Sequence, residues 1–288
     1  MECNLKLADP LFDQVHTGKY RLSILLRPDG FSFSVLDTRT HTFIALSNYG
    51  LQSCTSAAPG NYKLCESLKE AYNNDEWLQM PYLRVDIAYA SPKVTLIPQG
   101  FVHEESIENY FRFNHQLDAA EIIAAQYSEV GGMQLVYAVP ACIQNLCASK
   151  FGILQPVSTA GILIDSLLKA NDHILARQVF LHLTGSYFDI IIIQGRKLLY
   201  FNTFRQSSPE DLVYFTIYVL EQLGFVPSEE IVTLLGDIET GDQGFQLLYQ
   251  YIDRLSFVNS GSVADFSPVF SEVPVHKYYT LFNLPFCE

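Results

Sequence analysis

One pattern of strands and turns occurs twice in this chain. Each copy contains three strand-like segments in a row, joined by short turns, at residues 20–51 and 177–208. The turn Arg27–Gly30 joins the first two strands of the first copy, and Thr184–Ser186 takes that place in the second copy. Such short, glycine-containing connections are typical of β-hairpins. The repeat therefore predicts two similar domains that face one cleft.

Each triple of strands leads into a helix. In the second copy Pro209 follows two serines and precedes Glu210 and Asp211, an order that favours a helix start. Apolar residues recur at helical spacing as far as Gly224, and Ile231–Leu235 has the composition of a strand. The apolar face of the first-copy helix is expected at Leu64, Leu68, Ala71 and Tyr72. Both copies are thus expected to form β-β-β-α-β units.

The length of 288 residues and the apolar content of 49% suffice for two domains, each with its own core. We expect the first domain to cover residues 1–156 and the second to cover residues 157–288. An α+β region is expected as an insertion in the first domain, at about residues 82–135. Within it, Tyr82–Ala90 and Lys93–Pro98 are predicted to be paired strands.

The C-terminal segment is rich in aromatic residues and is expected to belong to the second domain. Such a segment either folds back over its own domain or presents an apolar face to a partner. Its aromatic residues are Phe257, Phe266, Phe270, Tyr278, Tyr279, Phe282 and Phe286.

The charge of the chain argues against nucleic-acid binding. The formal net charge is −13, which would repel a phosphate backbone, and no run of Lys or Arg exceeds two residues. The longest apolar runs, such as Ile190–Ile193, are far shorter than the roughly 20 residues of a transmembrane helix. The start Met1–Pro10 does not have the pattern of a secretory signal. We therefore expect an acidic, cytoplasmic protein without a membrane span, whose six cysteines are reduced thiols.

The duplicated units with an insertion in the first half resemble the actin-like ATPase fold of actin, Hsp70 and the sugar kinases, which is ribonuclease H-like. Val136–Pro140, the helix after it and Phe151–Pro156 are similar to the corresponding part of the bacterial pilus-assembly and cell-division actin homologues. Over its whole length, ending in Leu281–Cys287, the chain resembles a family of uncharacterised bacterial proteins with this fold.

The resemblance implies a nucleotide site at the two hairpin turns. Active members of the superfamily carry Asp-x-Gly followed by Ser or Thr at each turn: the glycine admits the phosphates, and the aspartate holds Mg²⁺ through water or orients the attacking water. When Gly30 and Gly185 are aligned with the family glycines, Pro28 and Leu183 stand at the two aspartate positions. Both carboxylates are missing. Asp29 is not expected to replace the first one, because a shift of one residue along a strand reverses the direction of a side chain.

A third motif of the superfamily, a Gly-Gly pair near the adenine, is represented only by Gly236 followed by Asp237. If ATP with Mg²⁺ binds, the resemblance implies that it does so at these three motifs. The site residues would be Asp29, Gly30, Thr184, Gly185, Ser186, Gly236 and Asp237. No residue is assigned a catalytic or metal-binding role.

The missing aspartates favour a non-hydrolytic binding or scaffold protein with a degenerate nucleotide site and protein partners. The alternative is a nucleotide-dependent ATPase or small-molecule kinase whose carboxylate comes from Asp29, Asp189 or Asp237. One of these side chains would then have to point into the cleft. A third hypothesis is a self-assembling filament protein, which the high negative charge disfavours.

Overall fold

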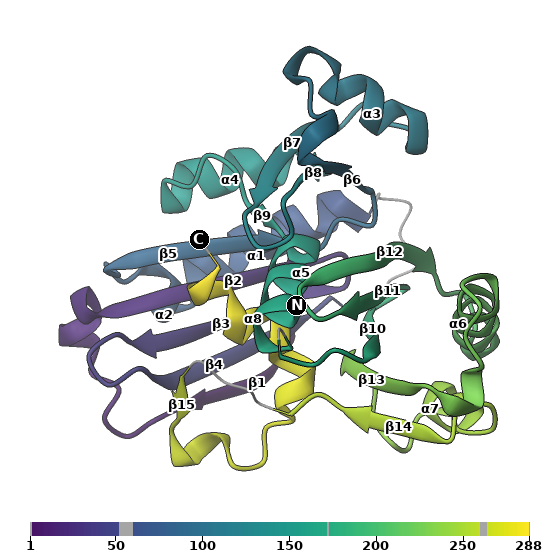
Figure 1. Ribbon diagram of the computed structural model, residues 1–288. Coiled ribbons are helices and arrows are strands. Elements are labelled where there is room, and N and C mark those ends of the chain that lie inside the picture. The colour runs from purple at the N-terminus through teal and green to yellow at the C-terminus, as the bar shows by residue number, and fades with distance from the viewer. Residues whose placement is uncertain (1, 52–59, 172, 260–263, 288) are drawn as a thin grey trace.

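The computed structural model describes residues 2–51, 60–171, 173–259 and 264–287. Two large sheets lie side by side, helix α5 runs between them, and a small third sheet projects at one end (Figure 1). Helix α8 lies beside α5 between the two large sheets (Figure 1).

The first sheet is built around the first copy of the repeat. Its strands follow the order β1-β4-β3-β2-β5-β9, and β15 pairs with β4. The β2, β3 and β4 strands are antiparallel neighbours, whereas β5 runs parallel to β2. The strands are β1 (Glu2–Ala8), β2 (Tyr20–Arg27), β3 (Gly30–Asp37), β4 (Thr42–Gly50), β5 (Arg84–Tyr89), β9 (Val157–Ser158) and β15 (Asp265–Phe266).

The second sheet repeats this arrangement strand for strand. Its order is β12-β11-β10-β13-β14, which matches β4-β3-β2-β5-β9 of the first sheet. The hairpins are again antiparallel, and β13 runs parallel to β10. The strands are β10 (Arg177–Thr184), β11 (Tyr187–Gln194), β12 (Lys197–Arg205), β13 (Ile231–Gly236) and β14 (Arg254–Phe257). This correspondence confirms the duplication that the sequence predicted.

The third sheet has the order β6-β8-β7, and its strands are β6 (Val94–Pro98), β7 (Glu121–Ser128) and β8 (Met133–Pro140). The prediction that Tyr82–Ala90 and Lys93–Pro98 pair with each other was wrong: β5 belongs to the first sheet and β6 pairs with β8. Two strand-like segments with a short connection look like a hairpin in sequence. The parallel partner of β5, however, lies far away along the chain.

The helices lie between and around the sheets. The α-helices are α1 (Gly60–Asn74), α2 (Glu76–Gln79), α3 (Ile107–Asn114), α4 (Ala141–Phe151), α5 (Thr159–Ala170), α6 (Pro209–Gln222), α7 (Gln243–Leu248) and α8 (Tyr279–Asn283). The 3₁₀ helices are η1 (Gln14–Lys19), η2 (Gln99–Phe101), η3 (Glu104–Ser106), η4 (Pro227–Glu229), η5 (Pro268–Phe270), η6 (Val275–Tyr278) and η7 (Leu284–Phe286). Within the described ranges, none of these helices combines the length and the apolar character needed to cross a bilayer.

One hydrophobic core extends across both sheets. It contains Leu22 and Phe33 of the first sheet, Leu163 of α5, and Phe180 and Ile191 of the second sheet. Every residue of α5 from Thr159 to Leu168 is buried, so this helix has no solvent face along that stretch. A second core lies between the second sheet and the helices α6 and α7. The shared core holds the two copies of the repeat against each other.

From Asp265 onward the C-terminal segment packs mainly on the first sheet, whereas Phe257 lies in β14, and His276 and Thr280 contact the second sheet. The β15 strand pairs with β4, and Phe266 and Phe282 pack on Phe43 at ring-centroid distances of 5.4 and 4.8 Å. The same core contains Leu25 of β2 and Leu281 of α8. These aromatic rings cover the apolar face of β2–β4. The assignment of the segment to the second domain stays a prediction. The division of the chain at residue 156 stays a prediction.

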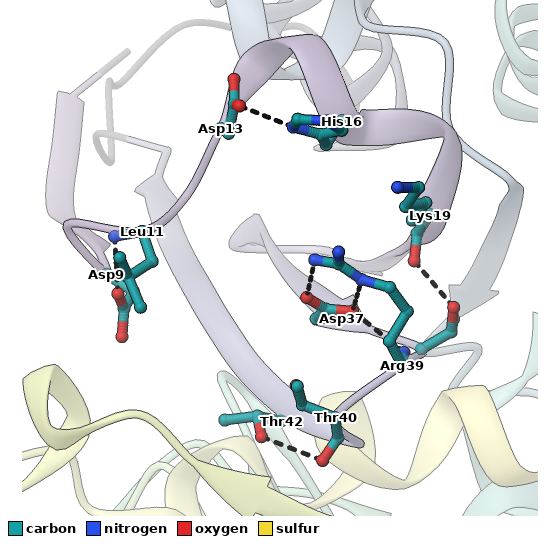
Figure 2. Close-up of polar contacts among 10 residues, drawn as sticks. Asp9, Leu11, Asp13, His16, Lys19, Asp37, Arg39, Thr40 and Thr42 are labelled. Carbon is teal, nitrogen blue, oxygen red and sulfur yellow. Dashed lines mark hydrogen bonds and ion pairs between the residues drawn. The ribbon is translucent and has the colours of Figure 1, made fainter.

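The turn after β3 is fixed by a local ion pair. Figure 2 shows the Arg39 guanidinium against the Asp37 carboxylate, with Nε and Nη2 donating over 3.0 and 2.6 Å. The backbone N–H of Arg39 also donates to Asp37 Oδ1. The Asp37 side chain is buried at this corner, whereas that of Arg39 is half-exposed. These hydrogen bonds hold the pKa of Asp37 below its ordinary value.

The lowered pKa of Asp37 predicts a pH dependence. Because the folded-state pKa is below the unfolded one, this contribution to stability is present above about pH 4 and is lost as the pH falls through the folded-state pKa. Asp37→Asn should lower the free energy of unfolding by about 1 kcal/mol at neutral pH and weaken its decline in acid. Urea titrations across pH 2–7 would measure both effects. The exposed Asp253→Asn is the control, and an unchanged acid decline in Asp37→Asn would contradict the prediction.

Candidate functional site

The β2–β3 turn lies tightly against the end of β4. Pro28 and Asp29 connect the paired residues Arg27 and Gly30. A Cβ atom at Gly30 would lie 2.1 Å from the carbonyl oxygen of Tyr49. Since no side chain can be placed there, this position requires glycine.

The β10–β11 turn and the end of β13 form the opposite side. Gly185 has a φ of 57° and stands first in the two-residue turn between Thr184 and Tyr187, where such hairpins often require glycine. Gly236 has a φ of 82°, and a Cβ there would lie 2.0 Å from the carbonyl oxygen of Leu183. Glycine is therefore required at both positions, because only glycine readily adopts these positive φ values and, at Gly236, lets the end of β13 lie against Leu183.

The two hairpin turns meet through Asp29. A Cβ atom at Gly185 would lie 3.0 Å from Asp29 Oδ2, so the carboxylate of the first turn rests on the glycine of the second. Asp29 lies in the turn, where strand alternation does not set the direction of a side chain. That it does not replace the missing aspartate stays a prediction. Any phosphate approaching the turn at Gly185 would meet this negative charge.

Arg27 lies beneath the two turns with 7% of its surface exposed. Its Nε is 3.3 Å from Asp29 Oδ1, and its Nη1 is 3.6 Å from Asp237 Oδ2. Nη2 donates to Asn48 Oδ1 over 3.4 Å, and that oxygen also accepts from Ser32. A buried cation needs nearby negative charge. Arg27 finds it in one carboxylate from the first hairpin turn and one from the second sheet.

Asp237 joins a second cation to this group. Lys277 Nζ, from the C-terminal segment, lies 3.5 Å from Asp237 Oδ1. We call Asp29, Arg27, Asp237 and Lys277 the Arg27 cluster; its two carboxylates balance its two cations. Burial raises the pKa of the adjoining Tyr278 to about 12, although the positive charge of Arg27 opposes that shift. The phenol is therefore neutral at physiological pH.

Little space remains between the turns. The cavity lined by Pro28, Ser91, Thr159 and Thr184 has a volume of about 20 Å³, enough for one water molecule. Pockets that bind small molecules usually enclose about 300–1,000 Å³. A larger groove of about 500 Å³ lies beside the Arg27 cluster, where Asn48 and Lys277 contribute to its wall.

A buried histidine connects the second sheet to α8. His182 Nδ1 lies 3.0 Å from Asp189 Oδ2, and Thr203 Oγ1 donates to Asp189 Oδ1 over 2.6 Å. On its other side, His182 Nε2 is 3.3 Å from Thr280 Oγ1. The order carboxylate, imidazole, hydroxyl resembles a nucleophile triad. Thr280 is only 2% exposed, however, so no substrate can reach it, and the group instead fastens α8 to the second sheet.

The structure gathers most of the residues that the sequence singled out. Asp29, Gly30, Gly185, Gly236 and Asp237 lie around the Arg27 cluster. Thr184 lines the small cavity, whereas Ser186 is exposed and its carbonyl accepts from the backbone of Gln206. Leu183 is packed in the core under α6, so its side chain faces away from the turns. Among the described residues, no three His, Cys, Asp or Glu side chains are placed to hold a metal ion.

Sequence reasoning missed Arg27 and Lys277. The sequence did contain one indication of the role of Arg27: it directly follows Leu22–Leu26, a strand-like segment without charged residues. Such a residue must find a partner when the strand is buried. Nothing near Lys277 in the sequence indicates its position, because it reaches Asp237 only through the fold of the C-terminal segment.

A family model described as "Protein of unknown function (DUF3822)" matches residues 9–255. The chain belongs to this family. None of the curated proteins matches the chain.

The solved structures that are similar to this chain include two that match most of its length. One is a Bacteroides thetaiotaomicron protein with an actin-like ATPase fold and unknown function, at 23% identity and a TM-score of 0.77, over 88% of this chain and 95% of that one. The other is the PilM–PilN type IV pilus biogenesis complex, at 14% identity and a TM-score of 0.56, over 92% of this chain and 97% of that one. These similarities confirm the actin-like fold.

We predict that removal of the Arg27 guanidinium destabilises the protein. Arg27→Met leaves two partly buried carboxylates facing each other and should lower the free energy of unfolding by about 2 kcal/mol. The matched control is Arg112→Met, which breaks an exposed pair with Glu108 and should cost less than about 0.5 kcal/mol. Equal costs in urea denaturation would contradict the role of Arg27.

The contact between the turns can be tested with two glycines. Gly185 and Gly132 have similar φ values, 57° and 62°, but of the two only Gly185 would bring an added methyl group within 4 Å of a neighbour, namely Asp29. Gly185→Ala should therefore cost about 1 kcal/mol more than Gly132→Ala. When each cost is measured against Asp29→Ser alone, which lacks the carboxylate, Gly185→Ala and Gly132→Ala should cost the same. If both alanine variants lose the same stability, the turns are not in contact.

Proposed function

We propose that this protein is a non-hydrolytic binding or scaffold protein in which the Arg27 cluster takes the place of a bound nucleotide. The observation that carries the proposal is the position of Asp29 and Arg27 between Gly30, Gly185 and Gly236. The resemblance aligns these three glycines with the phosphate and adenine motifs of the actin-like fold, which supports the proposal. Here the protein's own charges fill that position.

The chemistry of the turns supports this proposal. Pro28 and Leu183 replace the two aspartates that hydrolysis would need, and Leu183 is enclosed in the second core. Asp29 brings a negative charge to the turn that would bind phosphate. The space of about 20 Å³ between the turns is far below the volume of a nucleotide pocket.

A scaffold role requires a protein partner. The PilM–PilN structure, which shares this fold, is a complex of two proteins. The present chain has a net charge of −13, which would speed association with a basic partner. We therefore place the function of this protein in partner binding.

One observation favours a second candidate, a nucleotide-dependent enzyme. The Nε atom of Arg27 is buried and makes no hydrogen bond within the described residues, and the groove of about 500 Å³ lies next to the same cluster. An anionic group could use this donor if the turns moved apart. Asp29, which is 42% exposed at the side chain, would then be the candidate carboxylate.

The thermal unfolding midpoint with and without millimolar Mg-ATP separates these two candidates. At 100 times the Kd, a ligand stabilises the folded state by about 2.7 kcal/mol and raises the midpoint by several degrees. The scaffold proposal predicts a shift below about 1 °C with ATP or ADP, with Mg²⁺ alone as control. A shift of several degrees, or Mg²⁺-dependent ATP turnover that Gly185→Val abolishes, would contradict it.

A further inference from the structure

Helices α6 and α7 form an apolar groove on the outer side of the second sheet, away from the first sheet (Figure 1). Its volume is about 440 Å³, and its apolar walls come from Val213, Tyr214, Ile217, Tyr218, Leu247 and Tyr251. The groove is separate from the Arg27 cluster, since none of the residues that line it belongs to that cluster.

The tyrosines of this groove are open to solvent. Tyr214, Tyr251 and Tyr218 expose 63%, 55% and 49% of their surface. The opposite face of α6, which includes Leu212 and Leu220, is already buried against the second sheet. A helix that is apolar on both faces needs cover on both. Tyrosine is enriched among the residues that contribute most to binding in protein interfaces, so exposed tyrosines around an apolar groove indicate a binding surface.

The charged residues that line the groove are both acidic. Glu210 and Glu221 stand at its two ends on α6. The whole segment from residue 206 to residue 253 contains nine of the 31 acidic residues of the chain and no Lys, Arg or His. Of these nine, Glu230 pairs with Arg177, and Asp237 belongs to the Arg27 cluster. The acidic residues are Glu210, Asp211, Glu221, Glu229, Glu230, Asp237, Glu239, Asp242 and Asp253.

From these observations we infer that the α6–α7 groove binds an amphipathic helix of a partner protein, with an apolar face and basic residues on both sides of it. Glu210 and Glu221 are eleven residues apart, which is about 16 Å or three turns along a helix. The basic residues of the partner are thus expected about three turns apart. A helix-in-groove contact of this kind needs the apolar strip for affinity and the charges for orientation.

The charge pattern excludes other occupants. A second copy seated through the same groove would bring Glu210 and Glu221 against each other, and anionic lipid would meet the same repulsion. The inference rests on the proposed binding function and names the surface and the partner that this function requires.

Fluorescence anisotropy with two labelled 18-residue peptides tests this groove. The first probe is an amphipathic helix with leucines on one face and lysines on both sides of it, and the second carries glutamates in place of the lysines. We expect saturable binding of the lysine probe and at least tenfold weaker binding of the glutamate probe. The double variant Tyr214→Ser/Tyr218→Ser should weaken lysine-probe binding at least tenfold, as should Glu210→Gln/Glu221→Gln.

The matched control is the double variant Tyr127→Ser/Glu105→Gln, which changes an exposed tyrosine and an exposed glutamate outside the groove and should leave binding unchanged. The inference is overturned if the lysine probe does not bind, if both probes bind equally, or if the groove variants bind like the wild type. Sedimentation that shows a dimer dissociated by Tyr214→Ser/Tyr218→Ser would also overturn it. If the lysine probe does not bind and ATP has no effect on the unfolding midpoint, the inference about the groove is wrong but the proposed function stands. If the protein turns over ATP, the proposed function itself is wrong.

Discussion

Arg27 ends a largely uncharged, buried strand, and its guanidinium must be balanced inside the protein. The negative charges come from Asp29, in the turn that follows it, and from Asp237, at the end of a strand in the other sheet. Meeting this requirement brings the first hairpin turn, the second hairpin turn and the end of β13 to one place. The same packing leaves no room for a side chain at Gly30 or Gly236 and little room at Gly185, because neighbouring atoms lie close to the position of a Cβ atom.

The Arg27 cluster and the shared core have different effects on the fold. Burial of apolar residues from both sheets around α5 supplies the stabilisation. A partly buried group of ion pairs adds little net stability, because desolvation offsets much of the attraction, but it penalises every arrangement in which a charge is left without its partner. The cluster thus selects one position of the second sheet relative to the first. Side chains fill most of the junction between the two hairpin turns and leave a cavity of about 20 Å³.

The sequence predicted the features that depend on neighbouring residues and missed those that depend on residues far apart along the chain. Local signals, such as the turn at Gly185 and the helix start at Pro209, correctly predicted the hairpins, the α6 helix and hence the duplication. Local signals do not predict which distant segments pair, so the predicted partner of β5 was wrong. The pairing of β15 with β4 in the first sheet was not predicted either. The glycines of the site were found because each lies in a short local pattern, either a hairpin turn or the end of a strand. Arg27 was missed because its role depends on contacts that only the folded chain brings together.

If the junction is closed, a binding function must use the outer surfaces, and the acidic second half with its exposed tyrosines is the surface that the structure offers. The most direct test of the account is a double-mutant cycle between Arg27→Met and Asp237→Asn, measured by urea denaturation. Arg27 belongs to the first sheet and Asp237 follows the last residue of a strand in the second, so their coupling reports whether the cluster joins the two. We predict a coupling of about 1 kcal/mol or more. Additive effects within about 0.3 kcal/mol would mean that the cluster does not hold the sheets together.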